Sequence, residues 1–599
     1  MPSTNATLAA IFQQMADVNQ IVDGNRFKTN AYQKAARVMK ELTKDVSSVP
    51  PAELTSIEGV GKGLAEKIAE FVETGKIDEH RQMLADIPAG LLDLLEIPGL
   101  GPKGIAQLWR EAGVESVADL EAGIADGALA ELKGMGKKKL ENLSKGIAFL
   151  AKQGGRTHLG RALPLAQAVV EALSGLEGVE KIEYAGSLRR GKETIGDIDV
   201  LVAAHEAKTP TIMDAFVGMD IVDEVLGHGD TKSSVRTSDD TGAIQIDLRV
   251  VEPKHYGAAL MYFTGSKEHN VKLRERALSM GYTLNEYALS VKDVDKVKHG
   301  GSHPRAFAEG DHVATETEEA IYEALDLAWI APELREDRGE IALADPRNKS
   351  KLPELIELKD VRADLHTHTT ASDGVWSIEE NARAFAERGF HTVAITDHSK
   401  SQYQANGLDN DRLVQHIEAV RKVAKTLEGT ITVLAGSEVD ILADGTMDYP
   451  DELLAELDLV VASPHAALSQ EPKKATARLL KAIDNPYVTI MGHPTGRLVL
   501  KREGLSPDID ALVKAAAERG VAMEINANHW RLDLRDTHAR AAIAAGCKLA
   551  INTDAHGQGD THQLPYGVLT ARRAGATKQD VVNCMTAAQL KKWIASTRA

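Results

Sequence analysis

One pattern dominates the C-terminal part of this 599-residue chain: an apolar run that ends in His, Asp or Glu and is followed by a helical stretch. The pattern occurs six times, at His366 and His368, Asp397-His398, Glu438, His465, His493, and Asp554-Ala555-His556. Val521–Ile525 adds a seventh strand-like run. Strands that alternate with helices form parallel βα units, and the strands of a parallel barrel end at one face. We therefore expect an α/β barrel over residues 361–599, with these polar side chains around one site.

Nine side chains near these strand ends are candidate metal ligands: His366, His368, Asp373, His398, Glu438, His465, His493, Asp554 and His556. A single buried histidine is more often a satisfied core residue, but nine ligand-type residues at successive strand ends are not plausibly chance. Imidazole nitrogen and carboxylate oxygen without cysteine suit manganese, zinc or iron. Five other histidines fall outside the pattern and are not expected to be ligands: His391, His416, His529, His538 and His562.

This set resembles the polymerase and histidinol phosphatase (PHP) domain, a distorted (β/α)7 barrel that holds up to three metal ions. The resemblance implies three groups of ligands: His366, His368, Glu438 and Asp554 for one ion, Glu438, His465 and His493 for a second, and Asp373, His398 and His556 for a third. None of the nine is missing, so we expect residues 361–599 to form an active metallophosphoesterase.

A second group of carboxylates lies in residues 156–255. Asp197 and Asp199 flank Ile198 in a strand-like run, so both point to one face of the strand. Asp247 lies in another alternating run, and beside the first strand it completes a cradle of three carboxylates. Carboxylates this close repel one another unless cations lie between them. The arrangement therefore suits two hard cations, magnesium or manganese, in a two-metal site.

The residues around these carboxylates resemble the nucleotidyltransferase palm. Gly186-Ser187-Leu188-Arg189-Arg190 precedes them, and Tyr262-Phe263-Thr264-Gly265-Ser266 follows, with Asn270 and Arg274 beyond. Together these motifs resemble family X DNA polymerases, with a palm over residues 156–255 and a thumb over 256–330. The resemblance implies that Ser187, Arg190, Tyr262, Phe263, Gly265 and Asn270 bind the incoming nucleotide and that Arg274 contacts DNA. Ile195 departs from the small polar residue that is frequent there.

Three glycine turns mark the N-terminal part, each with an apolar residue between two glycines and a lysine-bearing helix after it. The glycines are Gly59 and Gly61, Gly99 and Gly101, and Gly134 and Gly136. The N–H groups of such a turn and helix start can hold a phosphate oxygen. The pattern resembles the helix-hairpin-helix motif, which grips the DNA backbone, although one copy alone is as well explained by ordinary helix packing. Three copies favour DNA binding.

Residues 1–80 resemble the small N-terminal domain of polymerase β-like enzymes, and residues 81–155 would form a second helix-hairpin-helix domain. The resemblance implies that Lys28 and Tyr32 hold a 5′-phosphate and that Lys67 is the Schiff-base lysine of a lyase. A lysine can act in this way only when its amine is free. A solvated helix lysine is the commoner explanation of Lys67.

Charge and composition restrict these interpretations. The net charge of −18 argues against a uniformly basic nucleic-acid binder, yet residues 133–152 hold six lysines and one carboxylate, a local cationic patch. Two cysteines are too few for a disulfide framework, no apolar run is as long as a membrane span, and the N-terminus shows no signal-peptide pattern. We therefore expect a cytoplasmic, nucleoid-associated bacterial protein without a membrane partner. Residues 331–360, rich in Pro and charge, are the expected interdomain linker, either extended or folded back.

The fold expected is thus a multidomain α+β and α/β chain: helical helix-hairpin-helix domains, palm, thumb and C-terminal (β/α)7 PHP barrel. The function expected is short-gap filling on primed DNA with dNTPs during repair, by a monomer whose PHP domain is a 3′→5′ exonuclease, with AP endonuclease or 3′-phosphodiesterase activity also open. Three alternatives remain: a PHP domain that serves as a metal-bound scaffold, a DNA-binding scaffold with both sites silent, and a small-molecule phosphatase of the histidinol phosphate type.

Overall fold

The computed structural model describes residues 4–41, 46–57, 60–97, 100–136, 139–141, 143–144, 147, 156–239, 242–297, 308–502 and 504–598. The chain divides into two compact units, Met1–Gly155 with Asp240–Ala243, and Arg156–Asp239 with Ile244–Ala599. Within the described ranges, no helix combines the length and apolar character needed to cross a membrane.

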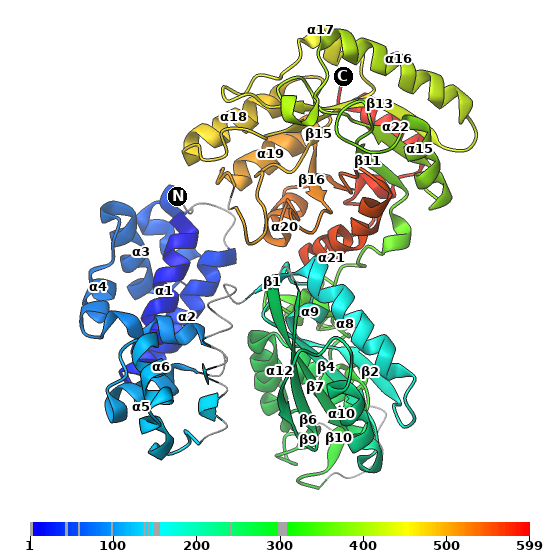
Figure 1. Ribbon diagram of the computed structural model, residues 1–599. Coiled ribbons are helices and arrows are strands. Elements are labelled where there is room, and N and C mark those ends of the chain that lie inside the picture. Colours follow the sequence, from blue (N-terminus) through cyan, green and yellow to red (C-terminus); the bar gives the residue numbers. More distant parts are fainter. Residues whose placement is uncertain are drawn as a thin grey trace. The chain divides into compact units, whose positions relative to one another are not determined.

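The first unit is helical (Figure 1). Its α-helices are α1 (Thr4–Ile21), α2 (Arg26–Glu41), α3 (Lys62–Thr74), α4 (Asp78–Ala85), α5 (Pro102–Ala112) and α6 (Val117–Ala125), joined in places by short 3-10 turns. Two apolar clusters hold it together. Phe12 and Met15 of α1 pack with α2 and α3 in the first cluster. Val18 and Ile21 of the same helix belong to the second cluster, with α5 and α6, so α1 spans both halves of the unit.

The palm opens the second unit with a five-stranded mixed sheet in the order β2-β4-β7-β6-β5. The strands are β2 (Lys181–Tyr184), β4 (Asp197–Ala203), β5 (Glu224–His228), β6 (Lys232–Asp239) and β7 (Gly242–Val251). A two-stranded sheet of β1 (Thr157–His158) and β3 (Thr194–Ile195) lies beside α8 (Leu159–Ser174). The palm also contains α9 (Gly186–Arg189), which contacts β4, and α10 (Thr209–Val217), which contacts β5 and β6. Alternate residues of β4 and β7 are buried against α8 and α10, which leaves the intervening residues for the opposite face.

The thumb consists of helices around a three-stranded sheet in the order β10-β9-β8. Its elements are α11 (Tyr256–Thr264), α12 (Lys267–Ser279), β8 (Tyr282–Leu284), β9 (Leu289–Val291), β10 (His312–Ala314) and α13 (Glu318–Ala324). The predicted linker begins here, and its first half is folded back. Arg335 is fully buried and donates to both carboxylate oxygens of Glu318, at 2.6 and 3.0 Å. A further short helix, α14 (Glu340–Ala344), follows.

The PHP region is a parallel barrel of seven strands in sequence order. The strands are β11 (Ala363–Thr367), β12 (Thr392–Ile395), β13 (Thr432–Asp440), β14 (Leu459–Ser463), β15 (Ile490–Met491), β16 (Ala522–Asn526) and β17 (Leu549–Asn552). A parallel bridge between Thr367 and Ala555 nearly closes the ring. Because the strands are buried on both faces, most of their side chains are apolar, as expected for a parallel sheet, and the exceptions include His366, Glu438 and Glu524.

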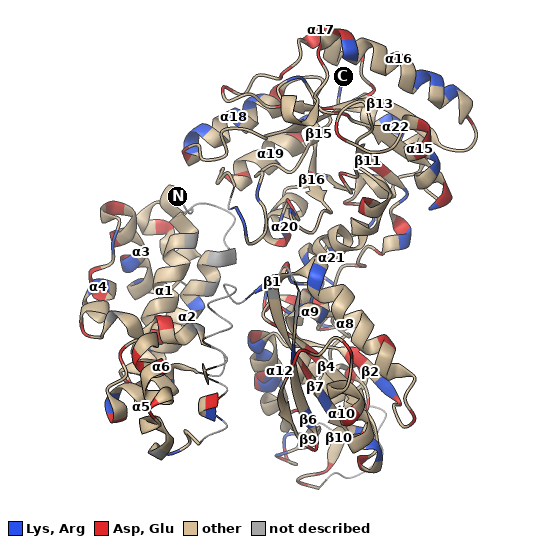
Figure 2. Ribbon diagram, in the orientation of Figure 1, with Lys and Arg blue, Asp and Glu red and all other residues tan. Residues whose placement is uncertain are grey.

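Helices connect and cover the barrel strands: α15 (Ile378–Glu387), α16 (Asn410–Thr426), α17 (Asp451–Leu454), α18 (Pro472–Asp484), α19 (Ile509–Arg519), α20 (Asp536–Ala544), α21 (Leu564–Ala574) and α22 (Ala587–Ser596). Side chains of α15, α16, α18, α19, α20 and α21 share one large apolar cluster with the outer faces of the strands. Both signs of charge are scattered over these elements and those of the palm (Figure 2). Because all seven strands are parallel, their carboxyl ends lie at one face of the barrel, and polar side chains gather there.

Candidate active sites

The palm carboxylates lie together at one end of two paired strands. β4 and β7 run parallel, in a register that places Asp199 opposite Asp247. Asp197 is two residues before Asp199 and is therefore on the same face. Gly186 of α9 adopts φ +63° against this face, where an added Cβ would lie only 2.6 Å from Asp199 Oδ2. A glycine is thus required for the α9 turn to approach the carboxylate.

Mutual repulsion is visible in the electrostatics of this triad. Burial and the charges of Asp197 and Asp247 raise the pKa of Asp199 to about 7. Burial and the charge of Asp247 also raise the pKa of Asp197. Lys232 Nζ lies 2.5 Å from Asp247 Oδ2, and Gln245 donates to its other oxygen at 2.8 Å. Arg156, Lys232 and Arg249 offset part of this charge, yet the pKa of Asp197 and of Asp199 stays raised, as expected of carboxylates that share divalent cations.

The predicted nucleotide-binding residues lie on α9 and around the junction of α11 and α12. Ser187 is in α9, and Tyr262 and Phe263 end α11 with their rings 5.2 Å apart in a T-shaped pair. Asn270 in α12 donates to the Tyr262 carbonyl at 2.7 Å, and Arg274 donates to the Asn270 carbonyl at 3.3 Å. Gly265, at φ +69°, joins α11 to α12. The structure therefore gathers the motif residues, with Asn270 holding the end of the aromatic helix.

Arg190 has a different environment from the one expected of a triphosphate contact. It is 9% exposed, its Nε donates to Glu336 at 3.0 Å, and its Nη1 donates to the Thr264 carbonyl at 2.5 Å. Arg573 of α21 in the barrel donates to the Arg190 carbonyl at 2.6 Å and to Glu336 at 2.9 Å. Arg190 thus belongs to a buried ionic network that joins palm, thumb and barrel, a role that its sequence motif did not indicate.

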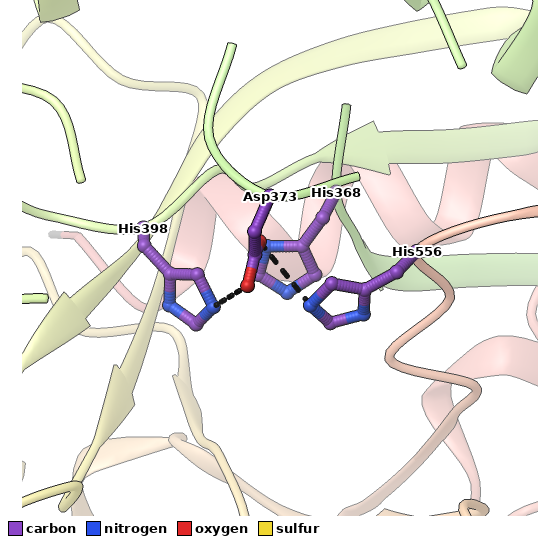
Figure 3. Close-up of side chains that lie close together, drawn as sticks. All are labelled: His368, Asp373, His398 and His556. Carbon is purple, nitrogen blue, oxygen red and sulfur yellow. Dashed lines mark ion pairs between the residues drawn. The ribbon is translucent and has the colours of Figure 1, made fainter. Parts of the chain in front are cut away.

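The nine barrel residues converge at the ends of the strands. The ligand-type atoms of His366, His368, Glu438 and Asp554 lie within 4.8 Å of one another, as do those of His368, Asp373, His398 and His556, and those of His398, Glu438 and His465. His493 joins through its Nε2, 2.8 Å from Glu438 Oε1. Figure 3 shows His368, Asp373, His398 and His556 directed toward a common point. The first group is the one expected from the sequence. The other two differ from the expectation: His368 joins Asp373, His398 and His556, and His398 lies with Glu438 and His465 in the place expected for His493.

Distances within the first group match those around a metal ion. His366 Nε2 lies 3.4 Å from Glu438 Oε2 and 3.5 Å from Asp554 Oδ1, and His368 Nε2 lies 3.0 Å from Asp554 Oδ1. Ligand atoms bonded at about 2.0–2.2 Å in tetrahedral geometry lie roughly 3.3–3.6 Å apart. The spacing is therefore that of a site shaped for a cation.

Unpaired polar atoms give a second test of this fit. Buried side-chain atoms without a hydrogen-bond partner are rare in proteins because each costs free energy. Here they cluster in the barrel site: His366 Nε2, His368 Nδ1 and Nε2, His398 Nδ1, both oxygens of Glu438, His465 Nε2, His493 Nδ1 and Nε2, and Asp554 Oδ1. A divalent cation would satisfy these atoms, so the donor set fits metal ions.

The charges of the site agree with this assignment. Burial lowers the pKa of His368 to about 4, which keeps its imidazole neutral, the form that binds metal. Burial alone would raise the pKa of Glu438, but His465, His366 and His398 lower it well below its ordinary value. The pKa of His465 is raised to about 9 by Glu438 and Asp440 in spite of its burial. Nearby carboxylates thus favour the protonated form of histidines such as His465, and bound metal ions would take the place of those protons.

Two supporting carboxylates were missed by the sequence analysis. Glu524 Oε1 lies 2.8 Å from His366 Nδ1, and Asp440 Oδ1 lies 2.9 Å from His465 Nδ1. Such partners orient a ligating imidazole and fix its tautomer. Asp440 could have been found, because it is two residues from Glu438 and faces the same side of β13.

Lys28 and Tyr32, expected to hold a 5′-phosphate, and Lys67, the expected Schiff-base lysine, do converge, but on a carboxylate. Glu79 of α4 receives Lys28 Nζ at 3.0 Å and the Tyr32 hydroxyl at 2.8 Å on Oε1, and Lys67 Nζ at 2.6 Å on Oε2. Burial opposes ionisation of Glu79, yet hydrogen bonds from Lys67, Lys28 and Tyr32 bring its pKa to about 2. The carboxylate of Glu79 thus occupies the centre of the group formed by Lys28, Tyr32 and Lys67, which we call the N-terminal cradle. No sequence motif pointed to Glu79.

The glycine turns are only partly described. Gly61 and Gly101 precede α3 and α5 as their N-cap residues, and both have open space where a Cβ would be. Gly134 has φ +79°, and Gly136 also has open space around it. Gly59 and Gly99 lie outside the described residues. The described glycines are therefore placed where a phosphate could approach the backbone closely.

Five family models match successive parts of this chain. They are a helix-hairpin-helix domain over residues 3–77, a SAM-like helix-hairpin-helix tandem over 91–148, the DNA polymerase beta palm over 162–251, the DNA polymerase beta thumb over 259–336 and the PHP domain over 364–528.

Known proteins resemble the chain in whole or in part. DNA polymerase/3′-5′ exonuclease PolX of Bacillus subtilis (strain 168) is 35% identical over 574 residues, 96% of each chain. A probable phosphatase of Thermoanaerobacter sp. (strain X514) is 30% identical over 231 residues, 37% of this chain and 89% of that protein. DNA polymerase lambda of Rattus norvegicus is 29% identical over 333 residues, 53% of each chain. Because the first relative aligns over nearly the whole length, and palm, thumb and PHP models match one chain, this protein belongs to the family X DNA polymerases with a C-terminal PHP domain.

Proposed function

We propose that this protein fills short gaps in DNA during repair and removes nucleotides from 3′ ends with its PHP domain. One observation carries the proposal: the chain contains two complete sites. In the palm, Asp199 lies opposite Asp247 in the register of two strands, with Asp197 beside them. In the barrel, nine histidine and carboxylate residues converge. The match to a DNA polymerase/3′-5′ exonuclease over 96% of the chain supports the same pairing of activities.

In the palm, Asp197, Asp199 and Asp247 would hold two magnesium or manganese ions. Such ions activate a primer hydroxyl and neutralise charge on a triphosphate and its leaving pyrophosphate. Ser187, which follows Gly186 at the triad, and the Tyr262-Phe263 pair would orient the dNTP, and Gly265 and Asn270 would fix the end of α11. Arg274 would contact DNA. The burial of Arg190 supports a role in positioning the α9 turn by way of Thr264 and Glu336.

In the barrel, the nine residues would hold up to three manganese, zinc or iron ions. These ions supply an acidified water for attack on phosphorus and stabilise charge on the phosphoester. The chain's own part is to keep His368 neutral, to orient His366 and His465 through Glu524 and Asp440, and to exclude bulk water from fully buried ligands. The substrate class proposed is a 3′ DNA end, with AP sites and blocked 3′ termini as further phosphodiester substrates.

A denaturing gel of a labelled primer on a short-gapped duplex, with manganese and with or without dNTPs, tests both activities. Lengthening with dNTPs and shortening without them support the proposal. Lengthening alone would reduce the PHP domain to a metal-bound scaffold, and shortening alone would remove the polymerase assignment. A DNA substrate also implies a bacterial cytoplasmic, nucleoid-associated location, and sedimentation of the purified chain tests the expected monomer.

The N-terminal cradle is proposed to bind a 5′-phosphate once Glu79 is displaced. Lys28, Tyr32 and Lys67 already point to one centre, but Glu79 competes there with a phosphate and keeps Lys67 paired. Replacement of Glu79 with Gln removes this anion. We expect Glu79→Gln to bind a 5′-phosphorylated gap about tenfold more tightly than the wild type, with no change for a 5′-hydroxyl gap. Equal effects on both gaps would contradict a phosphate site in the cradle.

A Schiff-base trap of an incised AP site with borohydride reads out lyase chemistry separately. A covalent adduct that forms in Glu79→Gln and disappears in Glu79→Gln/Lys67→Ala would identify Lys67 as its nucleophile. An adduct that survives loss of Lys67 would exclude that role.

A further inference from the structure

A cavity of about 380 Å³ lies where the palm meets the barrel, outside both sites described above. Its wall consists of Glu193 and Thr194 from the palm, and of the segment Arg497–Arg502 and Arg535 from the barrel. Of these residues four are cationic, Arg497, Lys501, Arg502 and Arg535, and one is acidic. A concave surface with this excess of cations attracts anions.

Only one of the four cations is neutralised. Arg497 is 4% exposed and pairs with Glu193 through two hydrogen bonds, of 3.0 and 2.6 Å. Among the described residues, no carboxylate lies within ion-pair distance of Lys501, Arg502 or Arg535. The Nε atoms of Arg497 and Arg535 are buried and have no hydrogen-bond acceptor. Arg502 donates to the Gly496 carbonyl at 3.0 and 2.7 Å, and Glu193 also faces the charge of Arg535, so one carboxylate serves four cations and the wall is short of negative charge.

The cationic segment is held in a fixed position. Val499 N donates to the Trp530 carbonyl at 2.6 Å, and Leu498 pairs with Arg502 in an antiparallel bridge. Asp533 Oδ2 accepts from Thr495 N and from Gly496 N, each at 2.9 Å, at the base of the segment. A segment ordered in this way loses little conformational freedom when an anion binds.

An aromatic side chain lies next to the cations. Lys501 Nζ is 3.8 Å from the centre of the Trp530 ring. Trp530 packs against His158 of the palm at 3.9 Å between ring centres, and His158 is the β-sheet partner of Thr194 in the cavity wall. Cations next to an exposed or half-exposed aromatic ring are the usual features of a groove for single-stranded nucleic acid.

The position of the cavity relates it to both active sites. Thr194 is three residues before Asp197, and Arg497 is four residues after His493. An extended chain spans at most about 3.6 Å per residue, so these Cα pairs are within roughly 11 and 14 Å. Arg531, which follows Trp530, lies with its Nε 3.6 Å from Asp554 Oδ2. The cationic wall thus begins near the palm carboxylates and leads toward the barrel ligands.

We propose that this cavity binds backbone phosphates of the DNA strand whose 3′ end has left the palm, and so guides that strand to the barrel site. The ligand class is a single-stranded DNA backbone. The inference rests on the proposed function for the fate of the bound strand, but the binding of single-stranded DNA is independent of any catalysis.

Binding is measured with a fluorescent oligo(dT) in EDTA, by anisotropy, over a range of salt concentrations. The variant is Lys501→Gln/Arg502→Gln, since both residues are exposed and the hydrogen bonds that Arg502 loses go to a single backbone carbonyl, that of Gly496. Each phosphate contact on a single strand contributes about 0.7 to the slope of log K against log salt. We expect a five- to tenfold loss of affinity and a slope smaller by about 1.4 for two contacts.

The matched control is Lys422→Gln/Lys425→Gln, which removes the same charge from exposed positions of α16. It should leave oligo(dT) affinity unchanged. Equal losses in both variants would overturn the proposal, because they would show a general charge effect. An unchanged affinity in Lys501→Gln/Arg502→Gln would overturn it as well. Displacement of oligo(dT) by a deoxynucleoside monophosphate at equal phosphate concentration would assign the cavity to a free nucleotide and also contradict a strand site.

Trimming of a single-stranded 3′ overhang provides the functional arm. The Lys501→Gln/Arg502→Gln variant should show a KM raised several-fold with kcat unchanged, and extension of a fully paired primer should stay at the wild-type rate. A fall in kcat at constant KM would contradict strand guidance. Absence of trimming in the wild type would refute the proposed exonuclease while leaving the binding measurement to decide on the cavity.

Discussion

The two candidate active sites of this chain are both built at the ends of parallel strands, yet they treat charge in opposite ways. The palm collects three carboxylates, with Asp197 exposed and one lysine close by. The barrel buries histidines and carboxylates together, and further carboxylates support the histidines. A site that stays open and repulsive is suited to cations that arrive with a charged substrate, whereas a buried, balanced site is suited to ions that remain bound.

Single substitutions should separate the two sites most strongly. We expect Asp199→Ala to reduce primer extension by at least about 10²-fold while 3′ trimming remains, and His368→Ala to do the reverse, because each removes a central ligand of one site only. Parallel gel assays of both variants on one gapped substrate check this. Loss of both activities in either variant would mean that the sites are not independent.

Loss of the Arg573 link should affect both regions at once. In Arg573→Met, Glu336 and Asp536 lose a buried partner at 2.9 and 2.8 Å, and one such loss typically costs about 3–5 kcal/mol. We expect a marked fall in the urea midpoint for unfolding and a weaker affinity for dNTP, since the Arg190 carbonyl also loses its donor.

The control is Lys578→Met, which removes the ion pair of an exposed lysine with Asp360 and should lower the urea midpoint much less. Equal effects of the two substitutions would show that the buried network contributes no more than a surface pair.

Removal of metal should sharpen the contrast between retained and delivered cations. After dialysis against a strong chelator and return of magnesium alone, we expect extension to recover and trimming to stay low. Stripping should also lower the melting temperature, because ions bound only to the folded barrel stabilise it. Calorimetry of the wild type and of His368→Ala checks this, and an unchanged melting temperature in the wild type would count against resident ions.

The smallest expected effect concerns Asp199 without cations. Its raised pKa of about 7 means that ionisation in the folded state destabilises the palm. The free energy of unfolding is therefore not reduced by Asp199 below about pH 4, where its carboxyl is protonated in both the folded and the unfolded chain. It falls as the pH rises to about 7, because the unfolded chain loses the proton first. In EDTA, Asp199→Asn should therefore be more stable than the wild type, by a margin that grows from pH 5.5 to pH 8. Urea midpoints at three pH values measure the margin, and a constant margin would contradict the raised pKa.

Features that follow from local periodicity could be predicted from the sequence. The alternation around Ile198 placed Asp197 and Asp199 on one face, and the repeated apolar runs placed the barrel ligands at strand ends. Contacts between distant segments could not be predicted. Glu79 meets Lys28 across 51 residues, and Arg573 meets Arg190 across 383, with no repeated spacing to signal either contact. Such pairs depend on the packing of whole elements, which periodicity does not specify.

The buried network around Arg573 also bears on how such a chain can be divided. The thumb and PHP family models end and begin at residues 336 and 364, and a cut between them would look natural. It would leave Glu336 without Arg573 and expose the carbonyl of Arg190. The palm and thumb are thus not an independent folding unit. A chain without the barrel would need other side chains at the surface that Arg573 now covers before the remaining part could fold as well as before.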